Sequence, residues 1–262
     1  MSGSDYNGST ISRFPMSTWR LLPPYDDGET ACAFGSLDAV FALRGENVSR
    51  DPQSETIRVG IGGAVYYVKR YRRAGKNPLR RWLLRPRVQA EWENLLAFAS
   101  WGIACPPVAG YGLERRAGFF VRGALITREQ ADTIDLARLA CERDPRLRER
   151  AWLAAIIPQA AQTARTIHEH GFTHNDFKWR NLLVDGTPTL YLIDCPCGEH
   201  WPEPFLRYRI IKDLACLDKV AKYQLSRTWR LRFFLAYTGK SRLAAADKRM
   251  IRRILRFFEG RE

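Results

Sequence analysis

The chain has 262 residues, enough for one large domain or two smaller lobes, and a hydrophobic content of 45% can supply a core. Lys and Arg outnumber Asp and Glu by 42 to 28, which gives a formal net charge of +14. This surplus favours polyanionic partners such as nucleic acid, anionic lipid headgroups or phosphorylated glycans.

Secretion and membrane-spanning signals are missing from the sequence. The first residues carry an early Asp5 and no apolar run, so they do not resemble a signal peptide. The longest apolar stretch, around residues 95–105, is far shorter than a bilayer crossing requires. The six cysteines include no C-x-x-C pair, which disfavours a zinc site. We expect a cytoplasmic protein with reduced thiols, soluble or attached to a membrane surface.

The first half of the chain is predicted to be mostly β-structure. Residues 1–18 are rich in Ser and Gly and are expected to be a flexible tail. Apolar residues at helical spacing predict a helix within residues 77–102 that ends at Gly102. The predicted strands are 36–44, two within 54–71 separated by a glycine turn, and a pair within 106–127.

The second half of the chain is predicted to be mostly helical. A long helix is predicted within residues 144–171 and ends at Gly171. Two short strands follow, around an Asp-Gly turn at residues 185–186, and from Ile210 onward the pattern is helical. A β-rich half joined to a helical half predicts two lobes with a cleft between them.

The stretch between the long helix and the two short strands combines several polar residues at fixed offsets. His174 is followed by Asp176, Lys178 and Asn181, and Asp194 then ends the apolar strand TLYLID. This is the spacing of the kinase catalytic loop, H-x-D-x-K-x-x-N, followed by a metal-binding aspartate at a strand end. Each residue alone would suit a polar turn, but all of them at these offsets favour catalysis.

The chemistry of phosphoryl transfer explains this spacing, because it depends on positioning and charge neutralisation. Asp176 would orient the attacking hydroxyl and accept its proton, and Lys178 would reach the transferring phosphate. Asn181 and Asp194 would supply oxygen ligands to Mg²⁺, which completes its shell with phosphate and water.

The β-rich half must then bind the nucleotide. Lys69 lies near the end of the strand AVYYVKRY, where a kinase carries the lysine that holds the α- and β-phosphates of ATP. Its carboxylate partner would come from the next helix, as Glu91 or Glu93. Glu91 shares a helix face with Leu95, four residues on and toward the core, so we favour Glu91.

A glycine-rich phosphate loop would join the first two strands of such a sheet, a whole strand before the lysine. The glycines within Gly60–Gly63 lie too close to Lys69 for that role and suit a hairpin turn. The appropriate stretch, residues 44–55, contains only Gly45. We therefore expect a looser, polar cover over the phosphates at Gly45–Arg50.

The chain resembles the Kdo/WaaP lipopolysaccharide kinase family, close to its InaA-like branch. The catalytic loop alone marks only the broad kinase-like fold, but its combination with KRY, GIACPPV and KDL is more specific. The matching stretches lie within residues 57–220 and are YYVKRY, AEWENLLAFASWGIACPPVAGYG, HEHGFTHNDFKWRNLLV, LYLIDC and RIIKDLACL.

The resemblance implies an α+β, two-lobed protein-kinase-like fold. A small antiparallel β-sheet lobe with one helix would bind nucleotide, and a mainly helical lobe would carry the catalytic loop, the metal site and the basic C-terminal helices. We place the flexible tail at 1–18, the first lobe at 19–128 and the second lobe at 129–262.

The resemblance also implies an enzyme that uses ATP and Mg²⁺ to phosphorylate heptose or Kdo of the lipopolysaccharide inner core at the cytoplasmic face of the inner membrane. The implied roles are nucleotide binding for Lys69 and Glu91, catalysis for Asp176, metal binding for Asn181 and Asp194, and bracing of the catalytic loop for Asp213.

Three departures from the protein-kinase pattern stand out. Asn175 replaces the usual Arg, Cys195–Pro196 replaces Phe-Gly, and no A-P-E follows. Control by loop phosphorylation and a protein substrate are therefore not expected.

Mixtures of basic and aromatic residues occur at 72–87, 226–242 and 247–260. A basic amphipathic helix can lie on an anionic membrane, although packing of the C-terminal helix on its own lobe is the favoured interpretation. For residues 72–87 a membrane or glycan contact is favoured. The sequence contains no nucleic-acid recognition motif, so nucleic acid is not an expected partner.

Two other functions fit parts of the pattern. The compact catalytic loop also resembles that of the aminoglycoside and choline phosphotransferases, which act on small molecules. A kinase-shaped binding protein without turnover is the third possibility, and loss of Lys69, Asp176 or Asp194 would have favoured it.

Overall fold

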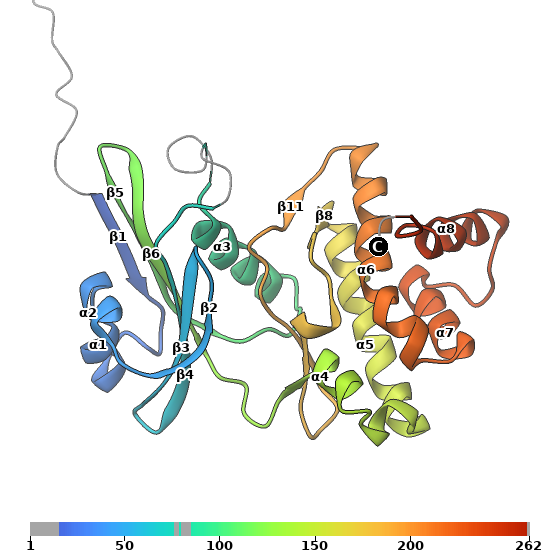
Figure 1. Ribbon diagram of the computed structural model, residues 1–262, viewed down its shortest axis with the longest axis horizontal. Helices are drawn as coiled ribbons and strands as arrows, with labels where there is room; N and C mark the ends of the chain where they lie inside the picture. The colour runs from blue at the N-terminus through green and yellow to red at the C-terminus, as the bar shows by residue number, and fades with distance from the viewer. Residues whose placement is uncertain (1–15, 76–78, 80–84, 261–262) are drawn as a thin grey trace, which may run out of the picture. The chain divides into compact units, whose positions relative to one another are not determined.

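The computed structural model of the protein describes residues 16–75, 79 and 85–260 (Figure 1). Most of the predicted tail and the middle of the basic stretch 72–87 lie outside the described residues. The chain forms two compact units: the first comprises the chain up to Gln89 together with Ala109–Thr127, and the second comprises Ala90–Val108 and Arg128–Glu262. Residues 90–108, predicted as part of the first lobe, therefore group with the second unit.

The first unit is built on one six-stranded sheet with the strand order β1-β5-β6-β4-β3-β2. Two helices, α1 (Gly28–Phe34) and α2 (Leu37–Ala42), precede the second strand. Phe34 and Val40 of these helices are fully buried, and Phe34 packs edge-on against Tyr66 of the sheet. The strands are β1 (Met16–Leu21), β2 (Glu46–Arg50), β3 (Ser54–Ile61), β4 (Ala64–Tyr71), β5 (Val108–Arg116) and β6 (Phe119–Arg128).

The segment 36–44, predicted as a strand, is instead the helix α2. The Ser36 side chain accepts a hydrogen bond from the Ala39 amide at 3.1 Å and caps the helix. Leu37 and Val40 are buried three residues apart, which is helical spacing. Over so short a segment, the apolar pattern fits the period of a strand as well as that of a helix. The serine at the N-cap was the sequence signal that favoured a helix.

The expected loose conformation of Gly45–Arg50 is also corrected by the structure, whereas its role as a phosphate cover stays a prediction. Most of this segment is the exposed edge strand β2, and the turn to β3 comes later, at residues 51–53. Asp51 closes that turn by accepting hydrogen bonds from the amides of Gln53 and Ser54. Gly45 is required for close packing, because a Cβ there would lie 2.5 Å from the carbonyl oxygen of Arg58.

The hairpin predicted at Gly60–Gly63 is present. Ile61 pairs with Ala64, and Gly62 and Gly63 adopt positive φ values of 59° and 72° in the two-residue turn between β3 and β4. The hairpin places Lys69 on β4 opposite Thr56 of β3.

The second unit is mainly helical, as predicted, and holds two small antiparallel sheets with the orders β10-β9-β7 and β11-β8. Helix α5 packs against α7, and α6 packs against α8 (Figure 1). Pro158 lies inside α5 without ending it. The helices are α3 (Arg87–Ser100, in this unit from Ala90), α4 (Leu136–Cys141), α5 (Arg150–Glu169), α6 (Phe205–Gln224), α7 (Arg227–Thr238) and α8 (Ala245–Leu255). The strands are β7 (Ile134–Asp135), β8 (Phe172–Thr173), β9 (Leu182–Val184), β10 (Leu190–Leu192) and β11 (Glu199–His200).

The C-terminal helix α8 packs on its own unit through a narrow apolar face. Ile254 is buried, and the Asp247 carboxylate accepts hydrogen bonds from the Ala244 amide and from the Lys240 ammonium. The arginines of this helix stay exposed. Among the described residues, no helix has both the length and the hydrophobicity needed to cross a bilayer.

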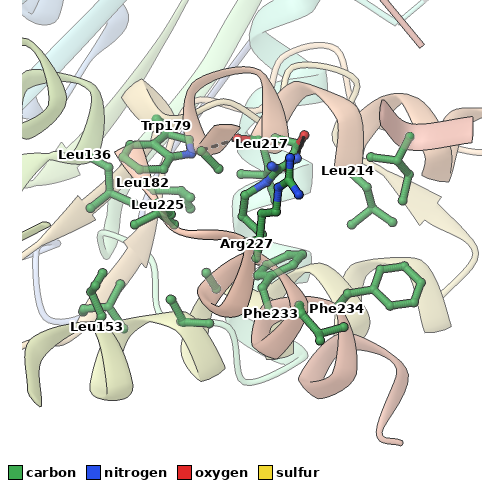
Figure 2. A pocket seen from close by; sticks show the side chains of 18 of the residues that line it. Leu136, Leu153, Trp179, Leu182, Leu214, Leu217, Leu225, Arg227, Phe233 and Phe234 are labelled. Atoms are coloured by element: carbon green, nitrogen blue, oxygen red, sulfur yellow. Dashed lines mark hydrogen bonds and ion pairs between the residues drawn. The ribbon is translucent and has the colours of Figure 1, made fainter. Parts of the chain in front are cut away.

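An apolar cavity of about 440 Å³ lies within the second unit (Figure 2). Its walls come from α5, α6, α7 and α8, and Trp179 of the loop after β8 forms part of them. Leucine, isoleucine and phenylalanine side chains dominate the lining, and Arg227, Arg230 and Asp218 are its charged members.

Candidate catalytic loop and metal site

The predicted catalytic loop connects β8 to β9 in the second unit and is held by its own backbone. The Lys178 amide donates to the Asp176 carbonyl at 2.9 Å, and the Asn181 amide donates to the Lys178 carbonyl at 2.9 Å. Phe177 is fully buried, and the indole N–H of Trp179 donates to the Leu217 carbonyl of α6 at 2.9 Å. Because Phe177 and Trp179 point into the core, the alternate residues Asp176, Lys178 and Arg180 face outward.

Asp176 is one of these outward residues, with a side chain that is 27% exposed. Its Oδ1 forms an ion pair with Lys178, and its Oδ2 accepts a hydrogen bond from Arg180 at 2.9 Å. Partial burial raises the pKa of the Asp176 carboxyl, but the two cations outweigh it, so the pKa lies below its usual value. Asp176 is therefore ionised at neutral pH, as a proton acceptor must be.

Asn181 and Asp194 are brought together by backbone pairing. The Ile193 amide donates to the Asn181 carbonyl at 3.0 Å, which places Asp194 beside the end of the catalytic loop. The Asn181 side-chain nitrogen donates to the Asp176 carbonyl at 2.8 Å, so its amide oxygen is the atom suited to a metal. An amide oxygen and a carboxylate fit Mg²⁺, which takes few protein ligands when phosphates supply the rest. Within the described ranges no group of three or more His, Cys, Asp or Glu side chains could hold a metal unaided.

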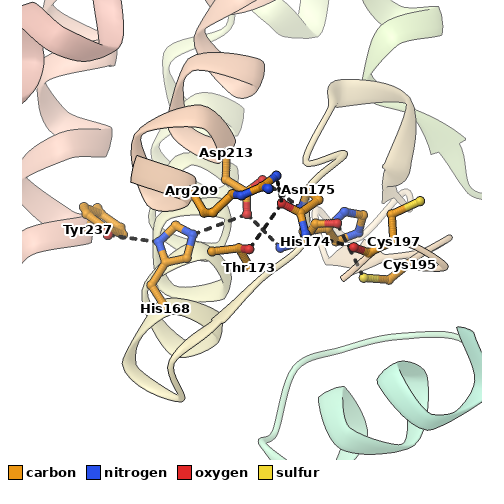
Figure 3. A network of polar contacts seen from close by, with 9 residues as sticks. All are labelled: His168, Thr173, His174, Asn175, Cys195, Cys197, Arg209, Asp213 and Tyr237. Carbon is orange, nitrogen blue, oxygen red and sulfur yellow. Dashed lines mark hydrogen bonds and ion pairs between the residues drawn. The ribbon is translucent and has the colours of Figure 1, made fainter. Parts of the chain in front are cut away.

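Asp213 braces the catalytic loop from α6, as predicted from the sequence (Figure 3). Its fully buried carboxylate accepts the His174 amide at 2.7 Å and the Asn175 amide at 2.9 Å. Asn175 has a φ of 63°, a left-handed conformation that costs free energy in a residue other than glycine. Asp194 shares this feature with a φ of 58°. The two strained positions flank the site, and the contacts of Asp213 hold the first of them.

His174 is fully buried between two aromatic rings, and Figure 3 shows it beside Asn175. Its imidazole stacks on Phe177 with centroids 5.5 Å apart and faces Phe98 of α3 at 6.3 Å. Burial lowers the pKa of His174 below its usual value, against the opposing influence of Asp213. The ring is therefore neutral and serves as an aromatic spacer in the core.

Two asparagines hold the segment after Asp194 in place through contacts that the sequence did not predict. Asn175 donates to the Cys197 carbonyl at 2.8 Å. Asn94 of α3 is buried and donates to the carbonyls of Cys195 at 2.7 Å and of Gly198 at 3.2 Å. The only sequence signal was a polar residue at a core position of an amphipathic helix, which must find hydrogen-bond partners.

The two residues predicted to bind nucleotide belong to different units. Lys69 is half-buried on β4 of the first unit, with its ammonium 5.5 Å from the ring centroid of Tyr71. Glu91 lies on α3 in the second unit and is 3% exposed, whereas Glu93 is half-buried. The preference for Glu91 over Glu93 as the carboxylate partner of Lys69 stays a prediction.

Comparison with known proteins defines the fold as protein-kinase-like. The solved structure "WaaP in complex with acyl carrier protein" matches with a TM-score of 0.70 and 23% sequence identity, over 92% of this chain and 100% of that chain. A curated relative, a probable serine/threonine-protein kinase of fowlpox virus (strain NVSL), is 31% identical over 105 residues, which are 40% of this chain. The chain spans only 33% of that relative's length.

A family model gives a narrower assignment than the fold. The model of the lipopolysaccharide kinase (Kdo/WaaP) family matches residues 42–237. The chain belongs to this family, and the predicted family and two-lobed kinase-like fold are confirmed.

Replacing Asp213 tests its bracing role. Asp213→Ala should leave the amides of His174 and Asn175 without acceptors, at a cost of about 1–3 kcal/mol for each buried group. We expect a clear drop in the free energy of unfolding, measured by urea denaturation. Glu169→Ala, which breaks only an exposed ion pair on α5, should cost less than about 1 kcal/mol. Equal effects of the two substitutions would contradict the bracing role.

The lowered pKa of His174 predicts a pH dependence of stability. The unfolded chain binds a proton at His174 near its ordinary pKa of 6.5, while the folded chain binds it only at lower pH. Stability should therefore be complete above pH 6.5 and fall as the pH drops below that value.

The melting temperature, followed from about pH 7.5 to pH 5.5, measures this loss. His174→Phe should flatten the profile in this window, and His170→Gln, at an exposed histidine, should leave it unchanged. A profile unaffected by His174→Phe would show that this ring is not the titrating group.

Proposed function

We propose that the protein is an ATP-dependent kinase that phosphorylates a sugar hydroxyl of the lipopolysaccharide inner core, on heptose or Kdo. The observation that carries this proposal is the catalytic loop, in which Asp176 and Asn181 are joined by a hydrogen bond and Asp194 lies beside them. Membership of the lipopolysaccharide kinase family supports the substrate class. The placement within the InaA-like branch stays a prediction.

Each residue of the loop has a task in this reaction. Asp176 orients the acceptor hydroxyl and takes its proton while the oxygen bonds to the γ-phosphorus and the bond to ADP breaks. Lys178 neutralises charge on the phosphoryl oxygens. Asn181 and Asp194 would hold Mg²⁺, which supplies charge neutralisation on the phosphates when bound.

The nucleotide roles of Lys69 and Glu91 belong to the same proposal. Lys69 would bind phosphate oxygens of ATP through its ammonium, as the strand lysine of a kinase does. Glu91 is proposed as its carboxylate partner in the nucleotide complex. Their support is the position of Lys69 on β4 and the burial of Glu91 on the following helix.

A small-molecule kinase and a silent binding protein remain the alternatives. The loop chemistry is the same for a soluble amino-sugar or choline acceptor, so only the acceptor separates the first alternative from our proposal. The second alternative requires loss of a reacting group, whereas Asp176, Asn181, Asp194 and Lys69 are all present.

The test is ATP consumption by the purified protein. We expect turnover with an underphosphorylated lipopolysaccharide core as acceptor, and none with soluble amino-sugars or choline. Asp176→Ala should lower turnover by at least about 100-fold, because it removes the proton acceptor, with ATP binding and melting temperature nearly unchanged.

Glu142→Ala is the matched control, since it removes an exposed carboxylate on the border of α4. It should retain the activity of the unmodified protein. Turnover only with the soluble acceptors would reject the core-sugar substrate, and full activity of Asp176→Ala would reject the role of that carboxylate.

The reaction is placed, as part of the same proposal, at the cytoplasmic face of the bacterial inner membrane. Residues 205–260 support a peripheral contact, since they contain fifteen Lys and Arg but only four Asp and Glu. Phe205 and Tyr223 are exposed beside these cations, at 61% and 74%. Flotation with vesicles should show binding to anionic but not to zwitterionic lipid, and binding that salt does not weaken would contradict this contact.

A carrier-protein partner is a second proposal, favoured by the apolar cavity of the second unit. The neighbouring solved structure is of WaaP in complex with acyl carrier protein. An acyl chain needs an apolar channel, and the cavity of about 440 Å³ is lined almost entirely by hydrocarbon side chains (Figure 2). We propose that the acyl group of such a carrier occupies it.

Filling the cavity tests this partner. Ala221 lines the cavity, so Ala221→Phe should weaken binding of acylated carrier protein by at least about tenfold. Ala246→Phe, at an exposed position of α8, is the control. Binding measured by calorimetry should favour the acylated over the unacylated carrier, and equal affinity for both would contradict the proposal.

A further inference from the structure

The apolar cavity of the second unit reaches the underside of the catalytic loop. Trp179 and Leu182 lie on either side of Asn181 in the sequence, and both line the cavity (Figure 2). Leu214 of α6 also lines the cavity, and it directly follows Asp213, which braces the same loop. The residues that shape the candidate site are therefore next to residues that face the cavity.

Trp179 provides the most direct connection between the two. Its side chain is 6% exposed, and its indole N–H donates to the Leu217 carbonyl of α6 at 2.9 Å. Trp179 and Asn181 belong to one 3₁₀ turn, and the Asn181 side chain donates to the Asp176 carbonyl at 2.8 Å. Because a close-packed interior transmits strain, a change in the position of the indole alters the turn that carries Asn181.

Packing explains why the contents of the cavity matter to this turn. Side chains that face a void have no contact atoms on that side and lose part of their dispersion energy. A cavity of about 440 Å³ gives the indole of Trp179 and the side chain of Leu182 room for other arrangements. A hydrocarbon group that fills the cavity would contact both side chains and favour the arrangement that Figure 2 shows.

We propose that Trp179 couples the cavity to the catalytic loop: an acyl group in the cavity holds the indole against α6, fixes Asn181 and raises the rate of phosphoryl transfer. Trp179 is a positioning residue in this scheme, because it acts through Asn181 and touches no reacting atom. This inference rests on the proposed kinase function and on the proposed acyl occupant, and it adds control of the reaction by that occupant.

The experiment measures kcat with and without an acyl group in the cavity. The acceptor is a lipid-free core saccharide, which brings no acyl chain of its own. The added probes are acylated carrier protein, unacylated carrier protein and dodecanoate below its micelle concentration. We expect the acylated carrier and dodecanoate to raise kcat by about fivefold or more, the lower range of coupling between two sites, and the unacylated carrier to have no effect.

Trp179→Ala should reduce the increase in kcat at saturating dodecanoate to less than about twofold, while calorimetry still shows dodecanoate binding. Trp179→Phe keeps an aromatic wall and removes only the hydrogen bond to Leu217, so a partial increase is expected. The phenylalanine variant decides the matter if the alanine variant does not fold.

Leu231→Ala is the matched control. Leu231 also lines the cavity, but it belongs to α7 and not to the catalytic loop. This variant should need more dodecanoate and still reach the full increase in kcat.

Hydrogen exchange of the amides of residues 174–184 gives a measurement that does not depend on turnover. Dodecanoate should slow this exchange in the unmodified protein and in Leu231→Ala, but not in Trp179→Ala.

Two results overturn the coupling while the kinase function stands: dodecanoate fails to raise kcat, or Trp179→Ala keeps the full increase. If the protein transfers phosphate to no acceptor, the proposed function fails, and hydrogen exchange alone then decides the coupling. Exchange that dodecanoate leaves unchanged would reject it.

Discussion

A single buried carboxylate, that of Asp213, underlies the geometry of the candidate site. It accepts two consecutive backbone amides, at His174 and Asn175, and so fixes the turn from which Asp176 projects. Because Asn175 is held in a left-handed conformation, the turn would relax without these contacts. His168 of α5 lies 3.6 Å from the same carboxylate and forms a hydrogen bond with the hydroxyl of Tyr237 of α7 (Figure 3).

The arrangement of the candidate loop could be predicted from the sequence because it depends on fixed offsets. Asp176, Lys178 and Asn181 lie close together in sequence, and the pairing of Ile193 with Asn181 then brings Asp194 alongside. The helices of the second half could also be predicted from the sequence, because their apolar residues recur with the helical period over many turns.

What escaped prediction depends on contacts distant in sequence or on segments with little pattern. The strand β2 is exposed at every residue, so no alternation marks it. Helix α2 is too short for its period to show. Asn94 acts on backbone carbonyls about a hundred residues away, and no local rule identifies those partners.

The double anchor of Asn94 limits how this protein can be controlled. The helix that carries Glu91 is bonded through Asn94 to the chain immediately after Asp194, all inside one unit. A displacement of α3 therefore also moves the segment that follows Asp194. Regulation by a movement of that helix alone would have to break both of these hydrogen bonds of Asn94.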